Sequence, residues 1–236
     1  MFTIIRQRRT FLVAMAAAAG VVLCCGCSSN GIGEALEELK IAKYGDDHDD
    51  GFVDPSTVTR GKFTDSRDGT EYKTVKIGKQ TWMAENLNKD MANSWCYKDS
   101  ADSCVKYGKL YNWSAATTAC PSGWHLPSSK EWDKLMTAVG GSSTAGKKLK
   151  STFGWNDYYG ESGNGTDVYG FSALPGGGRY SSGFFGTAGG NGYWWTATDN
   201  GGGDAYRRNM YYYGDYVYEG NDNDKGYGCS VRCVKD

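Results

Sequence analysis

The last five of the eight cysteines are the residues of this chain whose types and spacing could do chemistry. Cys96 and Cys104 flank a short polar loop that a disulfide between them would close, and Cys120 follows a predicted helix from which it could reach the C-terminal strand. Cys229 and Cys233 lie four residues apart, so on a strand roughly 13 Å would separate them at about 3.3 Å per residue. A disulfide needs Cα atoms within about 7 Å, so these two are not expected to pair together. In an oxidising compartment these cysteines are expected to form disulfides, and because their number is odd, one of them stays a free thiol.

A metal site or a catalytic thiol is the alternative use of these cysteines. These five cysteines contain no Cys-x-x-Cys pair, and His48 and His125 are isolated from them, whereas zinc needs four grouped ligands. The acidic run 46–50 superficially resembles a calcium loop, but His48 would take the third ligand position and Thr57 the place of the bidentate Glu. No Gly-x-Ser-x-Gly motif is present, and His125 is predicted to be structural. We therefore predict disulfides, with no metal and no catalytic residue.

Aromatic, amide and acidic side chains that could bind a ligand occur in two segments. The C–H faces of sugars stack on aromatic rings, while amides and carboxylates form hydrogen bonds with sugar hydroxyls. The candidate ligand-binding residues are Trp155, Asn156, Asp157 and Tyr158, followed by Tyr211 and Tyr213 in the segment 206–218. The competing interpretation is that these rings fill the core of a loop-rich domain. We predict a non-catalytic binding module, with polysaccharide as a partner; the alternative is a structural or adhesive surface protein that binds envelope proteins.

The N-terminal residues predict export. Three arginines within 6–9 precede an uncharged apolar run over 11–23, which is the layout of a signal peptide and is too short for a transmembrane helix. Residues 23–27, Leu-Cys-Cys-Gly-Cys, resemble a lipobox with its leucine one residue early, so we expect lipidation of Cys27. Cleavage without a lipid is the alternative, and the paired arginines also resemble a twin-arginine export signal. The expected location is the cell envelope, as an outer-membrane lipoprotein on its periplasmic or surface face.

Composition and charge divide the chain and limit its partners. After a signal peptide over 1–26, the polar and acidic stretch 27–60 buries too little to order itself, and we predict a linker there and one domain over 61–236. The formal charge is -1 and there is no basic stripe, so nucleic acid is not an expected partner. The 34 glycines and 17 tyrosines predict many tight loops packed on large side chains.

The elements that must position these residues are short. Asp68-Gly69 and the alternation over 72–77 predict a β-meander. One helix is predicted over 110–119, and a second follows Pro127, where Ser128 and Glu131 have the spacing of a capping box. Further strands are predicted over 193–198, 209–213, 216–218 and 229–234, with Gly214-Asp215 as a two-residue hairpin loop. The predicted class is α+β, with two short helices, short antiparallel strands and long loops.

Five segments in order carry a family resemblance. They are Gln-Thr-Trp-Met-Ala-Glu-Asn-Leu over 80–87, Tyr-Gly-Lys-Leu-Tyr-Asn-Trp over 107–113, Cys-Pro-Ser-Gly-Trp-His-Leu-Pro over 120–127, Gly-Phe-Ser-Ala-Leu-Pro-Gly-Gly over 170–177, and Ser-Val-Arg-Cys-Val over 230–234. Together they resemble the Fibrobacter succinogenes major paralogous domain over 61–236. That family is known chiefly as a set of exported paralogues without an established activity, so the resemblance implies a module and no reaction.

A second resemblance concerns the stretch 115–132, which is similar to the helix and Leu-Pro-Thr-Glu-Ala-Glu-Trp segment of the formylglycine-generating, sulfatase-modifying-factor fold. This fold is a C-type-lectin-like architecture in which a helix cysteine pairs with one near the C-terminal end. The resemblance therefore implies a Cys120 to Cys233 disulfide and leaves Cys229 as the unpaired thiol. Residues 155–157 also echo a calcium-ligand triplet of C-type lectins, although far upstream of the final cysteine, so calcium is only a minor alternative to no cofactor.

The resemblance also raises one enzyme hypothesis. An oxidase of the formylglycine-generating type needs two redox-active cysteines that hold copper. Cys229 and Cys233 are the only close pair in the C-terminal region, and the resemblance commits Cys233 to a structural bond. We therefore expect no enzyme activity.

Overall fold

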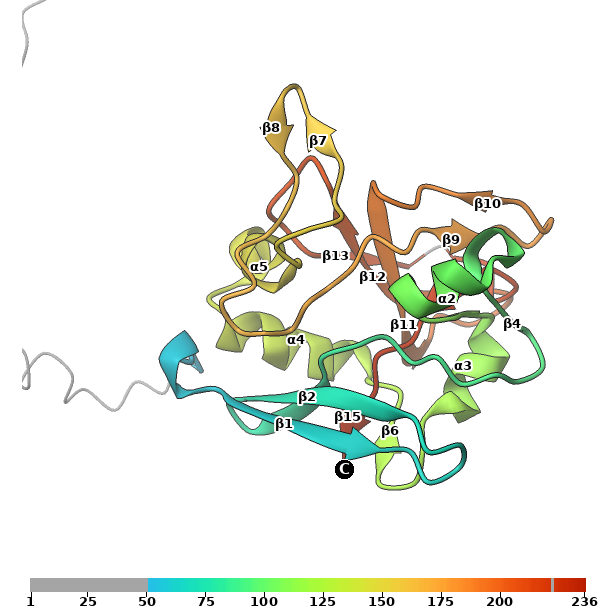
Figure 1. Cartoon of the computed structure of the whole chain (residues 1–236), viewed down its shortest axis with the longest axis horizontal. Helices are drawn as coiled ribbons and strands as arrows, with labels where there is room; N and C mark the ends of the chain where they lie inside the picture. The colour runs from blue at the N-terminus through green and yellow to red at the C-terminus, as the bar shows by residue number, and fades with distance from the viewer. Residues whose placement is uncertain (1–50, 222) are drawn as a thin grey trace, which may run out of the picture. The chain divides into compact units, whose positions relative to one another are not determined.

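The computed structural model describes residues 51–221 and 223–236, and Figure 1 shows how their elements are arranged. This part of the chain is a mixed α/β fold with four α-helices and several small sheets. The helices are α2 (Ala101–Tyr107), α3 (Trp113–Ala119), α4 (Ser129–Ala138) and α5 (Ser142–Leu149), with 3-10 turns η1 (Pro55–Thr57) and η2 (Tyr97–Asp99). Within the described residues, no helix is both long enough and apolar enough to cross a membrane.

The first sheet begins with the predicted meander, which is confirmed. Strands β1 (Thr59–Thr64), β2 (Glu71–Ile77) and β3 (Gln80–Met83) are antiparallel neighbours, and the sheet continues through β15 (Val234–Lys235) to β6 (Trp124–His125). Along β2, buried side chains alternate with exposed ones except at the adjacent pair Thr74 and Val75. Gly78 has a φ of 59°, a left-handed conformation that suits the two-residue turn into β3.

The second sheet has the strand order β13-β12-β11-β14-β5-β4. Its strands are β4 (Ser94–Trp95), β5 (Leu110–Tyr111), β11 (Asn191–Asp199), β12 (Ala205–Tyr211), β13 (Tyr218–Gly220) and β14 (Cys229–Ser230). Two small hairpins complete the strands: β7 (Asp157–Tyr158) with β8 (Glu161–Ser162), and β9 (Gly178–Arg179) with β10 (Phe185–Gly186). The β7–β8 hairpin stands out from the rest of the domain in Figure 1.

The prediction of one strand over 229–234 is wrong, because the chain changes sheets there. β14 pairs in the second sheet and β15 in the first, so residues 231–233 cross between them. Backbone bonds hold the crossing segment: the N–H of Leu87 donates to the carbonyl of Val231 at 2.8 Å. Arg232 lies between the two sheets with its side chain fully buried. The segment therefore ties the two sheets together.

The capping box of α4 forms as predicted. The Ser128 side chain accepts from the N–H of Glu131, whose carboxylate accepts in return from the N–H of Ser128. The helix predicted over 110–119 begins only after Asn112, because the two residues before it belong to β5. Asn112 caps α3 by accepting a hydrogen bond from the N–H of Ala115.

The number of helices corrects the prediction of two. α2 and α5 were not predicted, and α5 illustrates why. Its sequence, Ser-Ser-Thr-Ala-Gly-Lys-Lys-Leu, has the composition of a loop. A Cβ at Gly146 would lie 2.7 Å from the carbonyl oxygen of Tyr216, so a glycine is required where α5 packs on the segment 212–217. Tertiary packing, which local propensity does not report, therefore decides this helix.

The predicted two-residue hairpin loop at Gly214-Asp215 is also wrong. β12 and β13 are antiparallel partners, but the longer loop 212–217 connects them. The backbone N–H of Lys147 donates to the carbonyl of Asp215 at 3.1 Å, and Lys150 Nζ donates to the carbonyl of Gly214 at 3.0 Å. Because α5 and its C-cap hold these carbonyls, the loop follows the helix surface instead of closing as a tight turn.

Large aromatic side chains fill both parts of the core. Trp82, Trp132 and Trp194 are fully buried in one cluster, where the rings of Trp82 and Trp132 have centroids 5.0 Å apart. Tyr111 and Trp195 are fully buried in the other cluster. Much of the aromatic content therefore stabilises the fold, as the competing interpretation of the sequence proposed.

The folded part of the chain begins before residue 61. β1 starts at Thr59, and the side chains of Val53 and Val58 pack against the first core cluster. The hydroxyl of Tyr169 also donates to the carbonyl of Val53 at 2.8 Å. The boundary predicted at residue 61 therefore moves toward the N-terminus, because apolar side chains before it cover the core.

Candidate ligand-binding site

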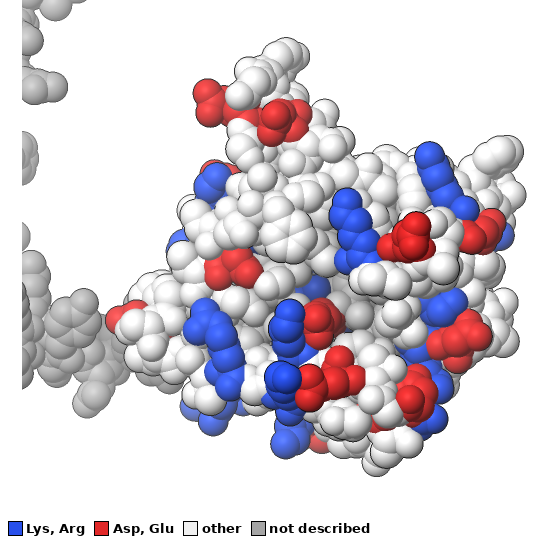
Figure 2. Space-filling model, in the orientation of Figure 1, with Lys and Arg blue, Asp and Glu red and all other residues white. Residues whose placement is uncertain are grey.

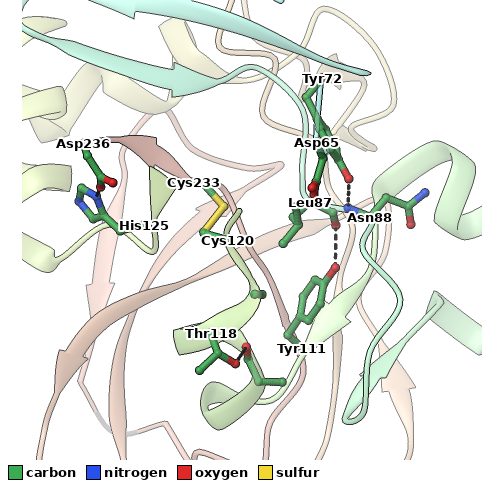
Figure 3. Close-up of a disulfide and its surroundings, with 12 residues drawn as sticks. Asp65, Tyr72, Leu87, Asn88, Tyr111, Thr118, Cys120, His125, Cys233 and Asp236 are labelled. Atoms are coloured by element: carbon green, nitrogen blue, oxygen red, sulfur yellow. Dashed lines mark hydrogen bonds and ion pairs between the residues drawn. A yellow bond between two sulfur atoms is a disulfide. The ribbon is translucent and has the colours of Figure 1, made fainter. Parts of the chain in front are cut away.

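The disulfides implied by the sequence are confirmed. Cys96 is bonded to Cys104, which links the segment before α2 to that helix. Cys120 is bonded to Cys233, which links the end of α3 to the start of β15 (Figure 3). Cys229 is free and buried, as the resemblance implied.

Cys229 is poorly suited to be a nucleophile or a metal ligand. Burial raises the pKa of its thiol to about 11, against the opposing charge of Arg207, whose Nη1 lies 4.0 Å from the sulfur. The thiolate is the reactive and metal-binding form of cysteine, and at neutral pH this group stays a thiol. Since Cys233 is bonded to Cys120, the pair Cys229 and Cys233 does not offer two free thiols.

A buried polar cluster joins three of the family segments. Asn86 Oδ1 accepts hydrogen bonds from Arg232 Nη2 at 2.7 Å and from Trp194 Nε1 at 2.9 Å. Arg232 also donates to the backbone carbonyls of Phe171 and Ser172. Burial lowers the pKa of Arg232 to about 9, and these accepting oxygens favour its protonated form. Asn86 and Arg232 were not among the predicted site residues, although each is a polar residue inside one of the family segments. Their contacts give them a structural role.

His125 is held between two carboxylates. Its Nδ1 lies 2.5 Å from Asp236 Oδ1, beside which Figure 3 places the ring, and its Nε2 lies 2.7 Å from Glu131 Oε1. Partial burial disfavours the charged imidazole, but the hydrogen bonds to Asp236 and Glu131 outweigh it and raise the pKa of His125. With both ring nitrogens engaged, His125 braces β6 and the residue after β15 against α4, in agreement with the structural role predicted for it.

Trp155 lies in the core and leaves the set of candidate binding residues. Its side chain is 4% exposed, and Nε1 donates to the carbonyl of Ala173 at 3.1 Å. Its backbone N–H donates to Asn164 Oδ1 at 3.0 Å. The ring therefore supports the base of the β7–β8 hairpin and presents no face to a ligand.

Tyr158 and Tyr213, by contrast, are brought together at the surface. Tyr158 ends β7 and is 41% exposed, while Tyr213 follows β12 and is 44% exposed. The centroids of their rings lie 5.7 Å apart, and Tyr212 packs edge-on to Tyr158 at 5.6 Å. Tyr159, at the turn of the hairpin, is 91% exposed and packs on Tyr158 at 4.5 Å.

Tyr211 extends this group along β12. Its ring stacks on that of Tyr213, with centroids 5.2 Å apart and planes 10° apart. Tyr218, at the start of β13, packs on Tyr211 at 5.8 Å and is exposed. Two predicted segments therefore meet as one tyrosine surface, which consists of Tyr158, Tyr159, Tyr211, Tyr212, Tyr213 and Tyr218.

A cavity of about 560 Å³ lies between the β7–β8 hairpin and the loop 212–217, and we call it the tyrosine cavity. Its lining residues are Lys147, Lys150, Tyr158, Tyr159, Glu161, Ser162, Tyr212, Tyr213, Gly214 and Asp215. The lining thus combines ring faces with a hydroxyl and with charges of both signs. On the face of the molecule in Figure 2, basic and acidic side chains are likewise interspersed.

Lys150 is a buried cation in this lining that sequence analysis missed. Its Nζ donates to the carbonyls of Tyr211 at 3.2 Å and Gly214 at 3.0 Å, and it lies 5.1 Å from the ring centroid of Trp155. Burial lowers the pKa of Lys150 to about 8, against the opposing charge of Asp215. Lys150 is a positioning residue for the loop that carries Tyr213. In the sequence it follows two other lysines, Lys147 and Lys148, and nothing there distinguishes it from a surface lysine.

The remaining predicted residues give no metal centre. Asn156 and Asp157 are exposed on the β7–β8 hairpin, where Asp157 pairs with Ser162 across the ladder. Within residues 51–221 and 223–236, no group of three or more His, Cys, Asp or Glu side chains is placed to hold a metal ion. Cys27, the predicted lipidation site, lies outside the described residues.

Comparison with known proteins places the chain in a family. The model of the Fibrobacter succinogenes major domain matches residues 75–235, which is more than half of the chain. The match spans both disulfides, the Asn86 and Arg232 cluster and the tyrosine cavity. Comparisons with the curated proteins and with the solved structures gave no match. The chain belongs to the Fibrobacter succinogenes major domain family.

Proposed function

We propose that this protein is a non-catalytic binding module of the cell envelope whose tyrosine cavity takes polysaccharide. The proposal rests on one observation above all: Tyr158 and Tyr213, from distant segments, lie 5.7 Å apart at one cavity with their rings partly exposed. Half-exposed aromatic rings offer apolar faces of the size of a sugar ring. A polymer of sugars can use several of these faces in succession.

Polar groups beside the rings complement this chemistry. Glu161 and Asp215 supply carboxylates that accept from sugar hydroxyls, and Ser162 supplies a hydroxyl. Lys150 already donates to two backbone carbonyls, so we assign it to holding the loop in place. This mixture of apolar faces and hydroxyl partners favours a sugar over a purely apolar ligand.

The state of the cysteines supports a non-catalytic module over an oxidase of the formylglycine-generating type. Such an oxidase needs two thiols in one place, and Cys233 is already bonded to Cys120. Cys229, the other member of the pair, is a buried thiol whose pKa burial raises to about 11.

We also propose that the fold is C-type-lectin-like. Two observations support this assignment. The first is the Cys120 to Cys233 disulfide between a helix end and the last strand. The second is the way β15 joins β3 and β6 in a sheet of antiparallel pairs. The loop-rich region between β7 and β10 would then be the ligand-binding side of the domain.

Attachment to a membrane through a lipid on Cys27 is a further part of the proposal. It rests on the apolar run over 11–23 and the lipobox-like residues before Cys27. The acidic linker that follows would hold the domain away from the membrane. We expect hydroxylamine-resistant lipid on the mature N-terminus that is lost in Cys27→Ala; a wild-type protein without lipid would refute this anchor.

A glycan array probed with the full chain tests the binding function, together with a pull-down from envelope extracts. We expect binding to polysaccharide spots that excess soluble polysaccharide of the same kind abolishes. Binding to an envelope protein with no signal on any glycan would reject the carbohydrate proposal and favour the adhesive alternative.

A further inference from the structure

A second cavity, of about 400 Å³, is lined by Arg207, an arginine that forms no ion pair with a carboxylate in the described part of the chain. We call it the arginine cavity; the residues used below are Tyr180, Ser181, Arg207, Asn223, Asp224 and Tyr227. Arg207 lies on β12, as does Tyr211 of the tyrosine surface. β12 therefore carries a residue of the arginine cavity and a residue of the tyrosine surface.

The guanidinium of Arg207 lies against two tyrosine rings. Its carbon lies 4.3 Å from the ring centroid of Tyr193 and 4.9 Å from that of Tyr227, and these rings are nearly perpendicular to each other. Cation–π contacts of this kind restrain the guanidinium without using its N–H donors. The residue is only half-buried and lines the cavity, so it is accessible to a ligand.

The donors of Arg207 have few partners in the protein. Its Nη1 lies 4.0 Å from the sulfur of Cys229, as described above. Among residues 51–221 and 223–236, no carboxylate forms an ion pair with Arg207, and its buried Nε has no hydrogen-bond partner there. The next residue makes the contrast: Arg208 pairs with Asp133 at 2.8 Å and with Glu219 at 2.6 Å. Arg207 lines the cavity, contacts two rings and has no carboxylate partner in the described part of the chain, which are the properties of an arginine that receives an external anion.

The other polar groups of the arginine cavity suit a hydroxylated ligand. Tyr180 contributes an exposed ring, and Asn223 lines the cavity with a buried amide whose Nδ2 donates to the carbonyl of Ala205 at 3.3 Å. Asp224 is engaged by Ser181 Oγ at 2.5 Å and by the N–H of Gly226 at 2.7 Å, which lower its pKa. This carboxylate can still accept from sugar hydroxyls, and it lies beyond ion-pair distance of Arg207.

Consecutive ring contacts connect the two cavities. From Tyr213 the path runs to Tyr211 at 5.2 Å, to Tyr193 at 6.5 Å and to Tyr227 at 6.2 Å, and Tyr180 packs on Tyr227 at 5.1 Å. Tyr193 is buried, whereas the ends of the path are exposed. One packed aromatic layer thus supports a ligand-facing cavity at each end.

We propose that the ligand is an acidic polysaccharide. A uronate carboxylate of this polymer binds Arg207, and other sugar units of the same polymer stack on Tyr158 and Tyr213. This inference rests on the proposed function of the tyrosine cavity and adds the chemical class of the ligand. A guanidinium fork matches a carboxylate with two parallel hydrogen bonds, which a neutral sugar cannot provide.

A pair of matched probes tests the inference: a galacturonic acid hexamer and its fully methyl-esterified form, titrated into the full chain by calorimetry. Esterification removes the charge of each carboxyl group and adds one methyl group, and the sugar backbone is unchanged. We expect the acid form to bind at least about tenfold more tightly than the ester, the ratio given by one charge-assisted hydrogen bond. Equal affinities for the two forms would overturn the inference in the wild-type protein, without recourse to any variant.

Variants locate the preference. Arg207→Gln should bind both forms with the affinity of the ester, whereas Arg179→Gln, which removes an arginine stacked on Trp95 at 4.1 Å, should keep the preference. An acid preference that survives Arg207→Gln would also overturn the assignment. Tyr213→Ala should weaken both forms equally. If neither form binds, and neutral polysaccharides do not bind either, the proposed function itself fails; if neutral ones bind, only the acidic assignment fails.

Discussion

The ring of Tyr158, at the end of β7, lies 5.7 Å from the ring of Tyr213, which follows β12. The two residues belong to segments that have no local reason to meet. Two features bring them together. The buried Trp155 supports the hairpin that carries Tyr158, and Lys150 holds the loop that carries Tyr213. The tyrosine cavity is thus a product of packing beneath it.

The long-range disulfide should contribute more to stability than the short one. In the chain-entropy model, removal of Cys120 to Cys233, with a sequence separation of 113, costs about 5 kcal/mol, and removal of Cys96 to Cys104, with a separation of 8, costs about 2.5 kcal/mol. Denaturant unfolding of the two double-alanine variants measures both losses. A smaller loss for the Cys120→Ala/Cys233→Ala variant would contradict its role as the main brace.

Asn86 should be among the most sensitive polar positions in the domain. Asn86→Ala removes the oxygen that accepts from Arg232 and Trp194, and it leaves a buried guanidinium and an indole N–H without that partner. We expect a loss of about 3 to 5 kcal/mol in the free energy of unfolding. Asn88→Ala is the matched control, since this exposed asparagine should change stability by less than about 0.5 kcal/mol. Equal losses in the two variants would refute the structural cluster.

Lys150 should make stability rise with pH in the alkaline range. The pKa of Lys150 is about 8 in the folded protein, whereas the ordinary value of 10.5 applies to the unfolded chain. Between pH 8 and pH 10.5 the unfolded chain therefore binds more protons at this residue than the folded protein does. Folding is then favoured as pH increases, by about 1 to 2 kcal/mol between pH 8 and pH 9.5. The difference in unfolding free energy between wild type and Lys150→Met isolates this effect from the tyrosines and Cys229. A difference that is flat or falls over that interval would refute the burial of an amine at this position.

Local signals in the sequence were sufficient for some elements. The capping box of Ser128 and Glu131 marks the start of α4 because both partners lie within one helical turn. The meander of β1 to β3 follows from alternation and from the turn at Gly78. The pairing of Cys120 with Cys233 came from family resemblance, since spacing alone left the partner of Cys120 open.

Contacts between distant segments explain what could not be predicted. The loop 212–217 departs from a tight hairpin because Lys147 and Lys150 hold its carbonyls, and α5 forms around Gly146 because that loop packs there. Burial also differs between aromatic residues that are close in sequence: Trp155 is in the core, and Tyr158 is at the surface. The sequence does not indicate which of them is buried, because strands of two residues are too short to show an alternation of buried and exposed positions.

Affinity electrophoresis of the full chain, in gels that contain xylan, galactomannan or polygalacturonate, measures whether the tyrosine cavity binds polysaccharide. We expect retardation of the wild type by at least one of these polysaccharides and its loss in Tyr158→Ala and Tyr213→Ala. Phe153→Ala, which removes an exposed ring that does not line the tyrosine cavity, should keep it. Unretarded migration of the wild type in all three gels, or retardation that both tyrosine variants retain, would refute polysaccharide binding at the tyrosine cavity.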